Sequence, residues 1–312
     1  MKKIGILVAF IIVITIIGFI LPTHKEYTTR VIVNCAPTAA TRVMSDPLLW
    51  KTWWPGEIIN DTSFTYHNKS IQIKNILLNG FYAVNTDLKI PSTIDLQFLS
   101  APNKQSEFIY TYTLYYSSNP FIKWIQFFQS NTIKSELISF LNDIKNNLED
   151  VKKVYGFEII EERVPNAIHI SMKKEFSYKP ANKEIYSIVD ELNKYITTNS
   201  AKAINAPIYN IFTADDEHYQ LMVAIATDKP LPTTDRFLFK EMVRGKIIIG
   251  KAIGSDSSVD QCSRQVEYFV KDHGRSSPAI QFNRLVTDRR IEKDSLNWIT
   301  TINYPVFDRS FF

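Results

Sequence analysis

An unbroken apolar run near the N-terminus constrains this chain more than any other feature. Ile4–Leu21 (IGILVAFIIVITIIGFIL) contains no charged residue. At 1.5 Å per residue, a helix of this length reaches about 27 Å, close to the roughly 30 Å of a bilayer's hydrocarbon core, whereas the apolar part of a signal peptide is usually shorter. We therefore expect one transmembrane helix, within an anchor segment of residues 1–22.

The residues that flank this run predict its orientation. Lys2 and Lys3 precede it, and Pro22–Glu26 follows it without the small-x-small pattern of a cleavage site. Lysines on the short side of an anchor favour a cytoplasmic location for that side. We expect a single-pass anchor in the inner (cytoplasmic) membrane, with the N-terminus in the cytoplasm and the bulk of the chain extracytoplasmic. A cleaved signal peptide is the alternative.

The remaining length suffices for two domains, each with its own core. The 36 basic and 32 acidic residues are spread along the chain, so the net charge of +4 does not form the clustered basic surface that nucleic acid binding requires. The two cysteines, Cys35 and Cys262, lie far apart in sequence. They are either buried thiols or, outside the cytoplasm, a disulfide.

Residues 23–152 predict an antiparallel sheet with a long helix. Lys25–Asn34 alternates as a strand does, and Pro37 opens a short helix. Several strands follow between Ser63 and Tyr116, the last with a strongly aromatic face, and apolar residues then recur at helical spacing from Ile133 to Leu148. A sheet curled around such a helix is an α+β domain in which a gap would form a cavity.

Three of the five tryptophans crowd into one short connector of this domain. Trp50, Trp53 and Trp54 lie between two prolines. Each indole needs a surface to pack on and a partner for its N–H group. Two interpretations remain open at this point: a plug that closes one end of the core, or the wall of a pocket.

The order of elements and the motifs VIVNCAP (31–37) and DPLLWKTWWPG (46–56) resemble the SRPBCC, or START-like, superfamily, which includes polyketide cyclase-like and lipid-transfer members with a helix-grip fold. The resemblance covers about Lys25–Asp150. It implies an internal ligand cavity with the three tryptophans at its entrance and the aromatic strand inside it. The candidate ligand-binding residues of this domain are Trp50, Trp53, Trp54, Tyr110, Tyr112 and Trp124.

Residues 156–308 contain an internal repeat of about 75 to 80 residues. Each copy reads strand, helix, strand, strand, with the helices at Asn182–Thr198 and Ser257–His273. One copy alone would leave a face of its small sheet uncovered, so the copies should pair and form a groove where they meet.

The second copy carries the motifs EMVRGK (241–246), PAIQF (278–282), Thr287-Asp288 and WITTINYPV (298–306). These resemble the GyrI-like domain, also called the bacterial transcription activator effector-binding domain, over about Phe157–Val306. The resemblance implies a groove for amphipathic, often cationic, small molecules, usually with a buried glutamate where this chain has Asn283. A neutral amide cannot offset a buried cation's charge, so cations should bind weakly. The candidate contacts are Phe282, Asn283, Trp298 and Tyr304.

Catalytic and metal-binding motifs do not occur in the sequence. G-x-S-x-G, H-E-x-x-H, C-x-x-C and the P-loop are all missing, so we expect no catalytic residue, cofactor or metal. The run Asp215–His218 is interpreted as a solvated hairpin tip, and Gly245, Gly250 and Gly254 as bulges and turns. A carboxylate in the second groove could still supply an acid or base, the candidates being Glu161, Glu162, Glu241 and Glu267.

The leading hypothesis is a membrane-anchored extracytoplasmic binding protein with two cavities for apolar or amphipathic small molecules. The alternatives are a small-molecule hydrolase or cyclase-like enzyme, and an envelope docking or stress-response module whose protein partner is unknown. Carboxylates facing a cavity would favour the enzyme. Dry aromatic cavities would favour the binder, and filled cavities beside an exposed apolar patch would favour the docking module.

Overall fold

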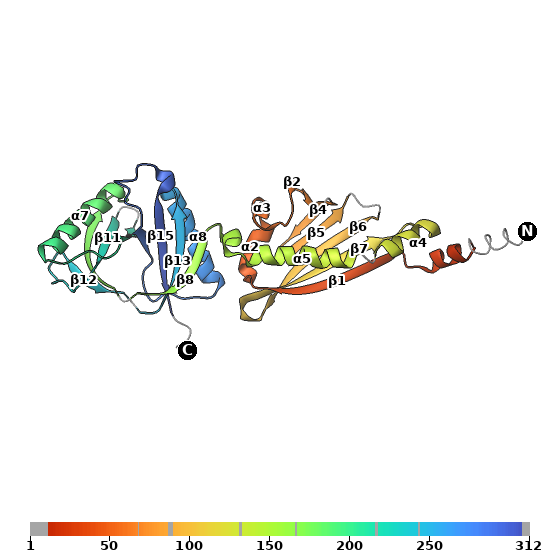
Figure 1. Cartoon of the computed structure of the whole chain (residues 1–312), viewed down its shortest axis with the longest axis horizontal. Coiled ribbons are helices and arrows are strands. Elements are labelled where there is room, and N and C mark those ends of the chain that lie inside the picture. Colours follow the sequence, from red (N-terminus) through yellow and green to blue (C-terminus); the bar gives the residue numbers. More distant parts are fainter. Residues whose placement is uncertain are drawn as a thin grey trace, which may run out of the picture. The chain divides into compact units, whose positions relative to one another are not determined.

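The computed structural model describes residues 12–67, 69–86, 90–130, 133–165, 167–215, 218–242 and 244–307. The chain divides into two compact units, Met1–Val154 and Tyr155–Phe312 (Figure 1). Each unit is built on one antiparallel sheet with helices packed on it, so the α+β prediction is confirmed.

The predicted anchor is described only in part. Residues 12–20 are helical, and residues 4–11 of the apolar run lie outside the described residues. Within the described part of the chain, no helix is long and apolar enough to cross a membrane.

The first unit runs from a long strand to a long helix. Its elements, in order, are β1 (His24–Val33), α2 (Pro37–Ser45), the 3-10 turn Pro47–Leu49, α3 (Trp50–Trp53), β2 (Ile58–Asn60), β3 (Ser63–Tyr66), β4 (Lys69–Leu77), β5 (Gly80–Asn85), β6 (Ser92–Ala101), the 3-10 turn Pro102–Lys104, β7 (Gln105–Tyr115), α4 (Pro120–Gln129), α5 (Ile133–Glu149) and α6 (Val151–Tyr155).

The sheet of the first unit has the order β1-β7-β6-β5-β4-β3-β2. The apolar stripe predicted between Ile133 and Leu148 forms the buried side of α5, and the residues from Leu137 to Leu148 at these positions are at most 6% exposed. On β7, alternation buries Phe108, Tyr110 and Tyr112 on one face. Helix and strand meet there, because the rings of Tyr110 and Phe140 lie 5.4 Å apart.

The second unit contains two similar halves. Its elements are β8 (Glu158–Arg163), β9 (Ile168–Phe176), α7 (Asn182–Thr198), β10 (Ile208–Asp215), β11 (His218–Thr227), β12 (Leu238–Glu241), β13 (Lys246–Ile253), α8 (Asp256–Asp272), β14 (Phe282–Leu285), the 3-10 turn Ser295–Asn297 and β15 (Ile299–Val306).

The order of its sheet, β12-β9-β11-β10-β14-β15-β13-β8, shows how the halves are joined. Strands β10 and β14 pair at the centre, and each half continues outward with two more strands. The outermost strands are exchanged: β8 of the first half pairs with β13, and β12 of the second half pairs with β9. The single strand predicted before each helix is therefore two strands, β8 and β9 before α7 and β12 and β13 before α8, and the two members of each pair lie in different halves of the sheet.

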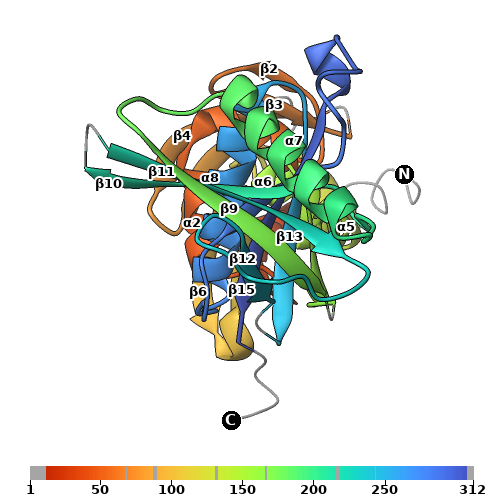
Figure 2. The same cartoon turned by 90° about the vertical axis from the view of Figure 1, so that its left-hand side faces the viewer.

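The sheet of the second unit has one face on which helices pack and an opposite face that carries a second, smaller apolar cluster. Helix α7 crosses β9 and β11 (Figure 2), and its apolar side packs in one cluster with Ile170 and Met172 of β9 and Leu221 and Val223 of β11. Because side chains alternate along a strand, the residues between these point to the other face of the sheet. That face holds the pocket described below.

Candidate functional site

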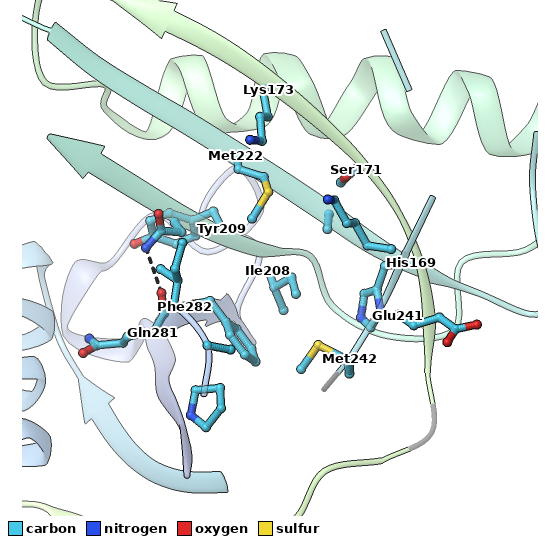
Figure 3. A pocket seen from close by; sticks show the side chains of 16 residues that line it. His169, Ser171, Lys173, Ile208, Tyr209, Met222, Glu241, Met242, Gln281 and Phe282 are labelled. Carbon is cyan, nitrogen blue, oxygen red and sulfur yellow. Dashed lines mark hydrogen bonds between the residues drawn. The ribbon is translucent and has the colours of Figure 1, made fainter. Parts of the chain in front are cut away.

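A pocket of about 390 Å³ lies on the face of the second sheet that α7 does not cover. Figure 3 shows its labelled side chains, with Phe282 and Gln281 on one side and His169, Glu241 and Met242 on the other. The volume is within the range of about 300–1,000 Å³ that is typical of small-molecule sites. The wall is largely apolar, with Ile208, Met222, Ala224, Met242, Ala279, Ile280, Phe282 and Pro305 among its residues.

Strand alternation explains why polar residues reach this pocket. On β9, His169, Ser171 and Lys173 line it, while the intervening Ile170 and Met172 belong to the core under α7. In the sequence, this alternation is indistinguishable from that of a strand with one solvated face. The pocket-lining role of β9 was therefore missed by sequence reasoning.

The charged side chains around the pocket are mainly basic. Lys173, Lys240 and Glu241 line it, which gives two positive charges against one negative. Arg284 lies close enough to His169 to lower the pKa of the imidazole by its charge. The pKa of Arg284 is itself lowered by burial, against the opposing effect of Glu162, and its Nε atom has no hydrogen-bond partner among the described residues.

The surroundings of His169 favour the neutral imidazole. Burial lowers the pKa of its imidazole, with the charge of Arg284 acting in the same direction and a backbone hydrogen bond to Ala167 against them. The imidazole Nδ1 lies 3.2 Å from the Ala167 carbonyl oxygen, so it carries the proton that it donates there. In the neutral ring, Nε2 is then a hydrogen-bond acceptor.

The pocket offers no assembled nucleophile. The Ser171 hydroxyl, fully buried, donates to the Leu238 carbonyl oxygen over 3.0 Å. Among the described contacts there is no hydrogen bond between Ser171 and His169, although a nucleophile and its base are normally within such reach. Of the four candidate carboxylates, Glu241 lines the pocket. Glu161 instead bridges Lys246 and Arg275, at 2.7 and 2.5 Å.

Two predicted site residues on β14 lie on opposite faces. Phe282 lines the pocket, whereas Asn283 is not among the lining residues and lies on the same face as the core residue Leu285. Tyr209 lies directly opposite Asn283 on β10; burial raises the pKa of its phenol and the Asn283 side chain acts against that shift. The Asn283 Oδ1 atom has no hydrogen-bond partner among the described residues. Asn283 therefore does not occupy the groove-floor position that the resemblance implies.

The other two candidates of this unit also lie away from the pocket. Trp298 donates from Nε1 to the Glu292 carbonyl oxygen over 2.9 Å, and the guanidinium of Arg289 lies 4.7 Å from its ring. Tyr304 is on β15 next to Pro305, which does line the pocket. Because neighbouring strand residues face opposite ways, Tyr304 points to the side where α8 packs.

The cavity expected in the first unit is almost filled. Tyr110 and Tyr112 line a space of about 30 Å³. That volume holds water but not the expected ligand. Phe140 of α5 occupies the centre, with the rings of Tyr66, Trp54 and Tyr110 at 4.8 to 5.4 Å from its own. The ligand-sized cavity predicted between the sheet and the helix of the first unit is therefore corrected to a nearly filled core.

The three clustered tryptophans form a core plug. Trp50, Trp53 and Trp54 are at most 5% exposed, and each indole N–H donates to a backbone carbonyl oxygen, of Met44, Val43 and Thr65 respectively, over 2.8 to 3.0 Å. None of them lines the small cavity, so the pocket-wall interpretation does not hold. Trp124 is on α4, 4.8 Å from Phe128, and does not line the cavity either.

In the described part of the chain, metal ligands and thiols add no further site. Among the described residues, no group of three or more His, Cys, Asp or Glu could hold a metal ion. Asp216 and Glu217 of the hairpin tip lie outside the described residues. Cys35 and Cys262 are both free and buried, each in a different unit, and burial raises the pKa of the Cys262 thiol to about 12.

Several solved structures are similar to part of this chain. The EcmrR C-terminal domain is 12% identical, with 49% of this chain and 98% of that chain covered and a TM-score of 0.43. SAV2435 bound to tetraphenylphosphonium is 14% identical, with 48% and 93% covered and a TM-score of 0.34. A hydrolase from Listeria innocua is 10% identical, with 48% and 91% covered and a TM-score of 0.38.

At such identities and TM-scores, the likeness carries neither a ligand nor an activity over to this chain. No protein-family model and no curated protein matches the sequence.

Proposed function

We propose that the chain is a membrane-anchored binding protein whose second unit takes a neutral or anionic amphipathic small molecule. The pocket beside β9 carries this proposal, since an apolar wall is edged by Lys173, Lys240 and a single carboxylate. An apolar body would occupy the wall, and a negative or polar group would lie near the lysines. A cation would meet a net positive edge.

The location is part of the proposal. Ile4–Leu21 would hold the chain in the inner membrane, and the lysines before it would keep the N-terminus in the cytoplasm. A reporter that fluoresces only in the cytoplasm, fused after Phe312, should then stay dark. A bright fusion would contradict the extracytoplasmic location.

We also propose a family relationship for each unit. A START-like origin for the first unit is supported by its order of strand, short helices, antiparallel strands and long terminal helix. A GyrI-like origin for the second is supported by its repeated strand-helix-strand-strand halves and by the motif WITTINYPV. In the first unit, the filled core argues for a structural rather than a ligand-binding role.

A pair of ions with the same shape tests the pocket. Tetraphenylborate and tetraphenylphosphonium differ mainly in the sign of their charge, so titrating the detergent-solubilised full chain with each isolates the electrostatic contribution. We expect the anion to bind about tenfold more tightly, which corresponds to about 1.4 kcal/mol. Equal affinities would contradict the charge preference, and no binding of either ion would contradict the pocket.

Charge-reversal variants test whether the preference for the anion arises in this pocket. Lys173→Glu with Lys240→Glu changes the lining from two lysines and one carboxylate to three carboxylates, and it should invert the preference. Lys202→Glu with Lys229→Glu makes the same change in net charge at exposed positions that do not line the pocket, and it should leave the preference unchanged. Ala279→Trp should block the pocket and lower the affinity for both ions to the same extent.

A further inference from the structure

Helix α4 of the first unit has its polarity reversed. Phe121, Ile122, Ile125 and Phe128 are 44 to 55% exposed, whereas Lys123 and Gln126 are 5% and 6% exposed. A surface helix normally turns its apolar stripe to the core and its charged side to water. In α4, four large apolar side chains point away from the protein while a lysine points into it.

Specific polar contacts hold α4 in this orientation. Gln126 accepts through Oε1 from the Ser117 backbone N–H over 2.8 Å. At the C-terminal end of α4, the Ser130 hydroxyl oxygen accepts from the phenol of Tyr116 over 2.9 Å, and the Ser130 carbonyl oxygen accepts from that of Tyr27 over 3.0 Å. Turning the helix over would break these contacts, so its apolar face is fixed outward.

The first turn of α4 contacts the end of the predicted anchor. Lys123 Nζ donates to the Leu21 carbonyl oxygen at 3.4 Å, and Gly18 packs so closely on Pro120 that a Cβ atom there would lie 2.4 Å from the Pro120 oxygen. Figure 1 shows residues 12–20 beside α4. These residues add further exposed apolar side chains, namely Ile12, Val13, Ile16, Ile17, Phe19 and Ile20.

The exposed side chains of α4 and of residues 12–20 fit a lipid environment better than a protein interface. Lys123 is the one charged residue of α4 and points inward, and residues 12–20 contain none. A protein interface usually has a polar and charged rim. The boundary between head groups and acyl chains accepts Trp and Phe side chains on a helix that lies in its plane. Trp124 is on α4. The Lys25 Nζ atom lies over the ring of Phe127, also on α4, 5.1 Å from the ring centre.

We infer that α4 is a membrane-surface helix. Phe121, Ile122, Ile125 and Phe128 enter the boundary between the head groups and acyl chains of the bilayer that Ile4–Leu21 is proposed to cross. The inference rests on that proposed anchor and adds a second lipid contact to it. The first unit is then held against the bilayer by two adjoining elements.

Fluorescence of a single label in the reconstituted full chain tests this contact. Ile125→Cys is labelled with an environment-sensitive dye in vesicles of phosphatidylcholine and phosphatidylglycerol, while the two native thiols are shielded by burial. The matched control is Leu78→Cys, an 80% exposed apolar position in the turn between β4 and β5 of the same unit. We expect blue-shifted emission and quenching by a shallow lipid-borne nitroxide at residue 125, and aqueous emission at residue 78.

The other outcomes separate the inference from the anchor. Aqueous emission at residue 125, in a chain that stays with the vesicles after a carbonate wash, overturns the inference and leaves the anchor standing. Loss of the chain in that wash overturns the anchor, and the inference with it. An apolar environment without lipid quenching shows that protein covers α4. A disulfide between two Ile125→Cys chains would then identify a second copy. Phe121→Cys, 44% exposed, gives an independent label position on the same face.

Discussion

Arg289 donates from Nη1 to Asp256 Oδ1 over 2.6 Å, although the arginine side chain is 2% exposed and the aspartate 66%. The same guanidinium donates to Asn182 at the start of α7 and to Thr300 of β15, over 2.7 and 2.9 Å. One buried cation therefore ties the first turn of α7 in one half to α8 and β15 in the other. Its counter-charge comes from a residue on the surface.

This asymmetry predicts that an exposed aspartate matters for stability. Asp256→Asn should lower the free energy of unfolding by about 1–3 kcal/mol, because it leaves the buried guanidinium without a counter-charge. Asp260→Asn, an exposed position one turn later on α8, should cost less than about 0.5 kcal/mol. Urea unfolding measures both. In an Arg289→Met background the Asp256→Asn cost should shrink, and an undiminished cost there would contradict the pairing.

Gly250 allows α8 to approach β13 closely. A Cβ atom at Gly250 would lie 2.4 Å from Val266 Cγ2 and 2.9 Å from Cys262 Sγ, so the residue serves packing and not the bulge or turn expected from sequence. Gly250→Ala should destabilise the chain by about 1–3 kcal/mol through overpacking. Val266→Ala should recover part of that loss when combined with it. Additive effects in thermal unfolding would show that the two side chains do not compete for this space.

The lowered pKa of His169 predicts a dependence of stability on pH. In the unfolded chain the imidazole titrates near 6.5, and in the folded protein below that value. As pH falls below about 6.5, the unfolded state takes up the proton first, so this histidine removes stability. Urea unfolding at pH 7.5 and at pH 5.5 measures this effect. We expect the free energy of unfolding to fall less between the two pH values in His169→Gln than in the native chain. An identical loss would place the pH dependence elsewhere.

The position of Asn283 predicts a stability effect without an effect on ligand choice. Asn283→Glu would place a carboxylate on the face of β14 opposite Phe282, near the Tyr209 phenol, and should cost about 1–3 kcal/mol. The ratio of tetraphenylborate to tetraphenylphosphonium affinity should remain within about twofold of the native value, which is under about 0.5 kcal/mol. A gain of about tenfold for the cation would instead place residue 283 at the bound ligand.

Burial predicts that Cys262 is unreactive in the folded protein. With the thiol pKa raised to about 12, almost no thiolate exists at pH 8, and the thiolate is the reactive form. A disulfide-forming reagent at pH 8 should label neither Cys262 nor the buried Cys35 until denaturant is added. Rapid labelling of Cys262 in the native chain would contradict the buried packing against Gly250.

The elements that the sequence predicted well are those that depend on local periodicity. The apolar spacing from Leu137 to Leu148 defines the buried side of α5, and the aromatic alternation through Tyr110 and Tyr112 defines the inner face of β7. Both patterns depend only on the geometry of a single element, 3.6 residues per turn or two per pleat. For that reason the sequence alone determined the α+β class and the repeat in the second unit.

Tertiary structure decided the features that depend on which elements meet. The exchange of β8 and β12 between halves depends on strand pairing far along the chain, which no local pattern encodes. Whether aromatic residues line a cavity or fill it depends on the volume left between sheet and helix, and Phe140 fills that volume. The face of β14 that meets the pocket is set by its register with β10, which directs Phe282 to the pocket and Asn283 to the core. The reversed polarity of α4 is likewise a tertiary feature, because periodicity gives a helix two faces but does not decide which one points outward.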